Sequence, residues 1–157
     1  SGKRAVPGRL FECFFIISAP GIGSHETGGH PYPPKVVWQF DGGGGGTTIP
    51  LQAVLPFCFP DPESASLRRF DTFAAEDFTF VLTDSNAGRC YGFCRHVLPC
   101  GPGGRYDVGR WRAPECLCLV SRFPHAGLFR HLLQVAHGIR LLAVGAAGGG
   151  GGAGNSG

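Results

Sequence analysis

The sequence predicts an α+β fold, in which helices pack on an antiparallel sheet. Three observations support this class. Short apolar and aromatic runs bounded by turn residues recur along the chain, which is the pattern of β-strands. One run, Phe78–Thr83, alternates between the two faces of a strand, and residues 84–88 after it have the composition of a hairpin turn. Near the C-terminus, one long segment has apolar residues at helical spacing.

Five strands are expected, of which the last three form an antiparallel meander. The first is a nearly continuous apolar run that ends before Pro20 and Gly21, and the second is rich in β-branched and aromatic residues. In the predicted hairpin, Asp84 holds the turn and Gly88 can take a positive φ. In chain order the strands are 10–18, 35–40, 78–83, 89–98 and 115–121.

Residues 56–62 are expected to be extended, because prolines recur every few positions. The following stretch, 63–76, is weakly helical. A long helix is expected from His125 to Val144, since Pro124 suits its first turn and a glycine-rich tract ends it. Its apolar stripe is Leu128, Leu132, Val135, Ile139 and Leu142.

We expect this helix to lie on the sheet face with the smaller side chains, because these allow a helix to approach closely. That face holds Cys90, Gly92, Cys94, Cys116 and Cys118. The opposite face is expected to lie under residues 56–76, and it holds Phe80, Leu82, Tyr91 and Phe93.

A chain of 157 residues is expected to form one domain, since domains contain roughly 100–200 residues. Thirteen of its 27 glycines lie in two tracts, Gly42–Gly46 and the stretch from Gly145 onwards. We therefore expect a flexible N-terminus at 1–9, a domain at 10–144 with a flexible insert at 41–48, and a glycine-rich tail or linker at 145–157. The absence of methionine, even at position 1, indicates a fragment.

Composition excludes several partner classes. The formal net charge is +3, only 16% of the residues are charged, and the arginines are scattered. A nucleic-acid binder needs a clustered basic stripe, so no nucleic-acid partner is expected. No run reaches the roughly 18 apolar residues of a membrane-spanning helix, so we expect no transmembrane segment. Seven cysteines in a chain without a secretory signal fit a reducing compartment, and we expect a cytoplasmic protein.

The sequence carries no convincing motif for a cofactor or for bond-breaking chemistry. Gly21 and Gly23 begin a dinucleotide-binding pattern, but Glu26 stands where its third glycine belongs. Cys90 and Cys94 would lie about 13 Å apart along one strand, which is too far for one zinc ion, and there is no CxxC pair. We therefore expect reduced and metal-free cysteines, no cofactor and no catalytic residue.

Three groups of motifs, taken in order, resemble the upstream (uDENN) module of the DENN-domain family. They are FCFP at 57–60, FTFVLTD at 78–84 with YGFCR at 91–95, and CLCLVSRFP at 116–124. The resemblance implies a longin-like antiparallel sheet with helices on both faces. It also implies guanine-nucleotide exchange on a Rab-family GTPase of membrane traffic, carried out together with a downstream DENN module of the same polypeptide.

The weakly helical stretch supplies the candidate partner-binding residues, namely Arg68, Arg69, Phe70 and Phe73. Arginines beside aromatic residues have a composition enriched at interfaces. In the alternative interpretation, both phenylalanines face the core and the arginines are simply solvated. Two functions stay open: the N-terminal module of an exchange factor, active only with its downstream module, and a module that docks a small GTPase or trafficking partner without exchange. The resemblance further implies a peripheral location at vesicle or endosomal membranes.

Overall fold

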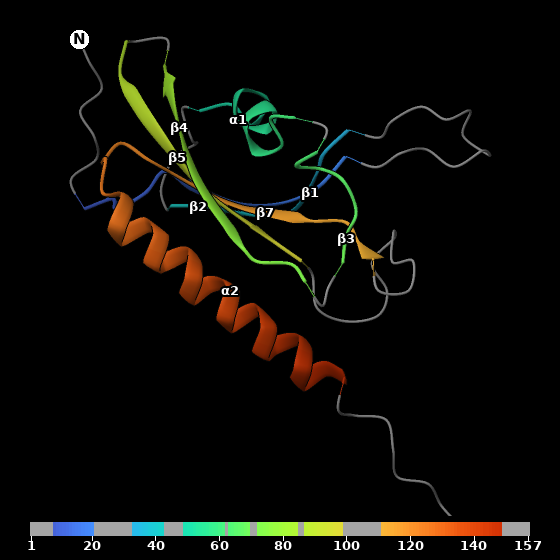
Figure 1. The fold of residues 1–157 in the computed structure, drawn as a ribbon. Helices are drawn as coiled ribbons and strands as arrows, with labels where there is room; N and C mark the ends of the chain where they lie inside the picture. The colour runs from blue at the N-terminus through green and yellow to red at the C-terminus, as the bar shows by residue number, and fades with distance from the viewer. Residues whose placement is uncertain are drawn as a thin grey trace, which may run out of the picture.

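The computed structural model describes residues 8–20, 33–42, 49–61, 63–69, 72–84, 87–98 and 111–148. These residues form an antiparallel sheet accompanied by two helices, which confirms the α+β class (Figure 1). In chain order the elements are β1 (Cys13–Ser18), β2 (Lys35–Asp41), α1 (Leu51–Cys58), β3 (Arg68–Arg69), β4 (Glu76–Thr83), β5 (Arg89–Val97), β6 (Trp111–Arg112), β7 (Glu115–Ser121) and α2 (Ala126–Gly148).

Five strands form the main sheet in the order β2-β1-β7-β5-β4. Each neighbouring pair is antiparallel. The predicted meander is therefore confirmed as β4–β5–β7, and β7 takes the centre of the sheet because β1 pairs with its other side. The short strands β3 and β6 form a separate two-stranded ladder.

Asp84 closes the hairpin between β4 and β5. Its amide donates to the carbonyl of Gly88 at 2.8 Å, and the Gly88 amide donates to the Asp84 carboxylate at 2.7 Å. The positive φ that we expected at Gly88 belongs instead to Ala87, where it is 58°. Gly88 is needed for space, because a Cβ there would lie 2.9 Å from the Asp84 carboxylate and 3.0 Å from the Arg122 guanidinium.

The side chains of the sheet form two hydrophobic clusters on its opposite faces, because successive residues of a strand alternate between them. On one face, the cysteines of β5 and β7 pack with Phe15 of β1 and with Val54 and Cys58 of α1. On the other face, Phe93 of β5 and two leucines of β7 pack with Phe129 and Leu133 of α2. The long helix thus lies on the bulky face, and the prediction that it covers the cysteine face is wrong.

The register between β4 and β5 explains this error. Phe80 pairs with Gly92 and Leu82 pairs with Cys90, so both large side chains of β4 point to the cysteine face. They fill the space above the small residues of β5 and β7, and α1 lies beside them. The cysteine face is therefore not a shallow surface onto which a long helix could pack.

The short helix α1 replaces part of the stretch that we expected to be extended. Pro56 lies inside the helix, where it removes one backbone donor, but the helix has only eight residues and Pro56 is exposed. Val54 and Cys58 are four residues apart, on one side of the helix, and both are fully buried. The burial of these two side chains outweighs the preference of the prolines for an extended backbone.

The stretch 63–76 is not helical over its described residues. The amide of Ser64 donates to the Asp61 carboxylate at 2.7 Å, and the Ser66 hydroxyl donates to the carbonyl of Glu63 at 2.7 Å. Such local bonds stabilise turns in competition with a helix. The chain then passes through β3 and enters β4 at Glu76.

Several predicted segments lie wholly or partly outside the described residues. These are positions 1–7 of the N-terminus, 43–48 of the insert, 149–157 of the tail, and Phe70. Helix α2 ends at Gly148, beyond the predicted end at Val144. Of the helices in the described ranges, none combines the length and apolar character needed to cross a membrane.

Candidate functional site

Two of the predicted partner-binding residues lie on a strand and not on a helix. Arg68 and Arg69 make up β3, where they pair with Arg112 and Trp111 of β6. The Arg68 guanidinium is half-buried and donates to the carbonyl of Glu63 at 3.0 Å, whereas Arg69 is exposed. The ladder thus brings Arg69 opposite a tryptophan that the sequence analysis left in a loop.

The structure describes only one of the two predicted phenylalanines. Phe73 is half-buried, so its exposure is lower than expected of an interface residue and higher than expected of a core residue. Phe70 lies outside the described residues, so its role stays a prediction. The ladder of β3 and β6, with Phe73 after it, is called the arginine ladder below.

An aromatic patch on the edge strand β2 was missed by the sequence analysis. Trp38 and Phe40 are 47% and 46% exposed, and their rings stack at 6.2 Å with an interplanar angle of 7°. Phe14 of β1 contacts Trp38 edge-on at 5.7 Å. Phe14 and Ile16 pair with Phe40 and Trp38, so the patch lies on the same face of the sheet as α2. The signal was present in the sequence: Trp38 and Phe40 are two residues apart, so two large aromatic side chains share one face of this strand, with Gln39 on the other.

A second apolar surface lies on the outer side of α2. We call it the α2 stripe, and it consists of Leu128, Val135, Ile139 and Leu142, which are between 44% and 76% exposed. These residues were expected to face the sheet, and that expectation is wrong because Phe129 and Leu133 are buried there instead. Of the predicted stripe, Leu132 does pack against the core cluster under the helix. Helix α2 therefore has apolar residues on two sides, although only one of them packs on the sheet. Exposed apolar stripes of this kind are typical of interaction sites.

The charges near the inner side of α2 are paired with the sheet. Arg140 donates to the Glu115 carboxylate at 3.1 Å, and Arg95 of β5 donates to Asp77 at 2.8 Å. Burial, followed by repulsion from Arg95 and Arg140, lowers the pKa of His137. The helix itself contains no acidic residue. The Arg140–Glu115 pair holds α2 on β7, whereas the Arg95–Asp77 pair joins β5 to β4 beside the helix.

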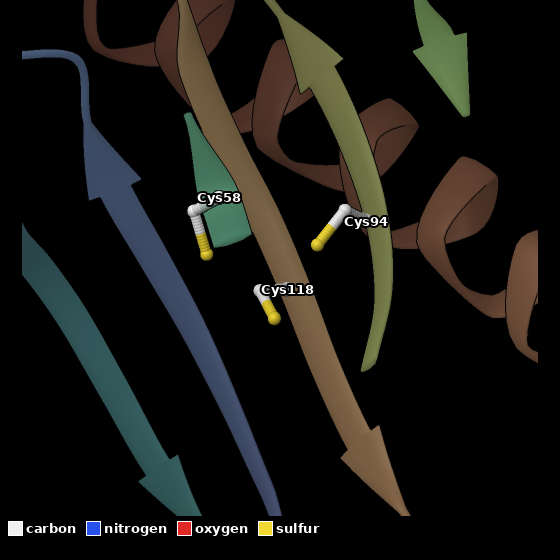
Figure 2. Close-up of side chains that lie close together, drawn as sticks. All are labelled: Cys58, Cys94 and Cys118. Carbon is white, nitrogen blue, oxygen red and sulfur yellow. The ribbon is translucent and has the colours of Figure 1, made fainter. Parts of the chain in front are cut away.

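Three cysteines from different elements meet on the opposite face of the sheet. The Sγ atoms of Cys58, Cys94 and Cys118 all lie within 4.8 Å of one another, and the three side chains are buried. Figure 2 shows them coming from the end of α1, from β5 and from β7, with their sulfur atoms at the corners of a triangle. Within the described ranges this is the group of side chains that could hold a metal ion.

The thiols of this cluster influence one another's protonation. Hydrogen bonds from the Cys116, Cys118 and Cys94 thiols lower the pKa of Cys58. Burial raises the pKa of Cys94 and of Cys116, whereas the hydrogen bond to Cys58 is the main cause that raises the pKa of Cys118. The thiols of the cluster are therefore coupled, and burial opposes the ionisation of Cys94 and Cys116.

Comparison with known proteins identifies the family. Residues 30–97 match the family model of the uDENN domain. DENN domain-containing protein 2B of Mus musculus is 33% identical over 131 residues, which cover 80% of this chain and 10% of that protein. DENN domain-containing protein 2C of Mus musculus is 33% identical over 133 residues, which cover 80% of this chain and 13% of that protein. DENN domain-containing protein 2D of Homo sapiens is 40% identical over 85 residues, which cover 54% of this chain and 16% of that protein.

The resemblance drawn from the sequence motifs is thereby confirmed, and the chain carries a DENN-family module of the uDENN type. It spans only about a tenth to a sixth of the length of these three relatives.

Proposed function

We propose that this chain is the upstream module of a guanine-nucleotide exchange factor that acts on a Rab-family GTPase together with a downstream DENN module. The family match is the observation that carries this proposal. The proposal includes a longin-like fold, which is supported by α1 packing into one core cluster and α2 into the other. We further propose that the protein is cytoplasmic and works at the periphery of vesicle or endosomal membranes.

Exchange of this kind requires no nucleophile. An exchange factor binds the nucleotide-free GTPase more tightly than the loaded one, and by linkage it weakens nucleotide binding by the same factor. Nanomolar nucleotide affinity corresponds to about 12 kcal/mol, so the factor needs an interface of about 1,600 Å² or larger to oppose it. One small module can supply only part of that area, which is why a second module is part of the proposal.

The two kinds of exposed surface fit two kinds of partner. Permanent interfaces are more apolar than transient ones. We therefore assign the α2 stripe to the downstream module, which would cover Val135, Ile139 and Leu142 throughout the life of the protein. The arginine ladder is charged and contains a tryptophan, which suits a GTPase that binds and leaves.

The test is the release of a fluorescent guanine nucleotide from a panel of Rab GTPases. This chain alone is expected to accelerate release very little, whereas the chain with its downstream region accelerates it strongly on at least one Rab. Arg69→Glu in the longer protein is expected to slow release about tenfold, equivalent to roughly 1.4 kcal/mol of interface free energy. Arg89→Glu is the matched control, because Arg89 is also an exposed arginine on a strand but lies outside the ladder.

Rapid release by the isolated chain would contradict the two-module account. Binding of a Rab by the longer protein without release would instead establish the alternative function, a docking module without exchange activity. Equal slowing by Arg69→Glu and Arg89→Glu would remove the arginine ladder from the proposed interface.

A further inference from the structure

We propose that Cys58, Cys94 and Cys118, with Cys116 as the fourth thiol, form a binding site for a thiophilic metal ion, namely zinc. This proposal does not depend on the GTPase function. It replaces the expectation of metal-free cysteines, which rested on distances along one strand. The structure brings together thiols from α1, β5 and β7. Spacing within one strand does not reveal such contacts between different elements.

The first argument is the distance between the sulfur atoms. Sulfurs bound to one tetrahedral zinc at about 2.3 Å lie about 3.8 Å from each other. The three Sγ atoms already lie within 4.8 Å of one another before any ion is considered. Each sulfur would therefore move by no more than about 1 Å, which a small rotation about the Cα–Cβ bond supplies.

The fourth ligand follows from the geometry of β7. Cys116 and Cys118 are two residues apart, so their side chains leave the strand on the same face. Cys116 is fully buried in the same core cluster as the other three cysteines, and its thiol donates to the carbonyl of Leu117 at 3.8 Å. Four sulfur ligands complete the coordination shell of a structural zinc site.

The donor set selects the kind of ion. All the members of the group are thiols, and they lie in an apolar core with Phe15 and Val54. Soft thiolate ligands favour zinc or monovalent copper, whereas calcium and magnesium require oxygen ligands. Binding would displace the thiol protons, because the thiolate is the form that coordinates the metal.

The surroundings fix the position of the ligands. The Nε2–H of His96 donates to the carbonyl of Cys58 at 2.6 Å, and the His96 ring stacks on Phe59 at 5.1 Å. This contact ties the end of α1 to β5 and therefore sets where the Cys58 thiol lies. Cys94 and Cys118 are cross-strand partners in the ladder between β5 and β7, so their relative position is fixed by register. Outer contacts of this kind orient ligands in metal sites.

The test uses the full 157-residue chain, purified under reducing conditions without added metal. We expect elemental analysis to give about one zinc per chain, as for a closed four-ligand site. Replacement of the metal by cobalt should give the sulfur-to-cobalt absorption of a thiolate site. A strong chelator should lower the thermal midpoint by on the order of 10 °C, and added zinc should restore it.

Variants identify the ligands. Cys58→Ser and Cys118→Ser are expected to weaken metal affinity at least tenfold. Cys90→Ser is the matched control, because Cys90 is equally buried on the same face but does not belong to the cluster. If a cluster variant does not fold, the cobalt spectrum and the chelator experiment on the unaltered chain still decide the question.

The outcomes separate the site from ordinary core packing. One copper per chain in place of zinc, with the same dependence on the cysteine variants, would support the thiolate site with the other thiophilic ion. A purified chain without zinc or copper, whose thermal midpoint does not change when either is added, would overturn the proposal. A stoichiometric disulfide between cluster cysteines in the freshly purified, unreduced chain would also overturn it, as would equal metal loss in Cys90→Ser.

Discussion

Gly92 shows how one missing side chain determines the packing over this sheet. It pairs with Phe80, whose ring occupies the space that a Cβ at position 92 would fill. Phe80 also stacks on Phe57 at 4.9 Å, which links β4 to α1. We predict that Gly92→Ala lowers the free energy of unfolding by about 1–3 kcal/mol, because the ring must move within a packed core. Urea denaturation of the purified chain measures this value.

Gly138 provides the control at the same scale. It lies inside α2, and a Cβ there would have nothing within 4 Å. Gly138→Ala is expected to raise the free energy of unfolding by roughly 0.5–1 kcal/mol through helix propensity alone. Equal effects of the two substitutions would show that space at Gly92 is not the cause.

Helix α2 has two apolar sides, and they should respond differently to a charge. Ile139 is 62% exposed, so we predict that Ile139→Glu changes stability by no more than about 0.5 kcal/mol. The same substitution should weaken binding to the downstream module at least tenfold, because the glutamate would be buried in the proposed interface. Titration calorimetry with the separately produced downstream region measures this affinity.

Leu133 supplies the comparison on the inner side of the helix. It is buried against Phe93 and Leu117, so Leu133→Glu should unfold the chain. If Ile139→Glu leaves the affinity for the downstream region unchanged, the α2 stripe is not the covered surface.

The elements that were predicted correctly are those whose signals are local. The alternation in β4, the turn at Asp84 and the continuous apolar run of β7 are all contained in a few neighbouring residues. Helix α1 was missed because its buried pair, Val54 and Cys58, surrounds a proline that argues against a helix. The side of α2 that packs on the sheet was predicted wrongly because both sides of the helix are apolar. Which side packs depends on the sheet face that the large side chains of β4 fill.

At the scale of the whole molecule, tertiary contacts determine the candidate sites. Cys58, Cys94 and Cys118 are spread over 61 positions of sequence, and they meet only because α1 lies across β5 and β7. Arg69 and Trp111 likewise meet through a ladder between distant segments. The family, in contrast, could be identified from the sequence, because its motifs are contiguous and follow a fixed order.

The two core clusters share β5 and β7, and this sharing should make the molecule unfold as one unit. Phe129 is fully buried and stacks on Phe93 at 4.7 Å, on the face away from the thiols. Phe129→Ala is expected to cost about 3–5 kcal/mol. Because thiol labelling of a buried cysteine follows the population of the unfolded state, Cys94 and Cys118 should then be labelled at least about 100-fold faster, measured by mass spectrometry in the presence of a chelator. Ile139→Ala, at an exposed position of the same helix, should leave the labelling rate unchanged. Loss of helical signal in Phe129→Ala without faster labelling would mean that α2 detaches while the thiol side stays folded.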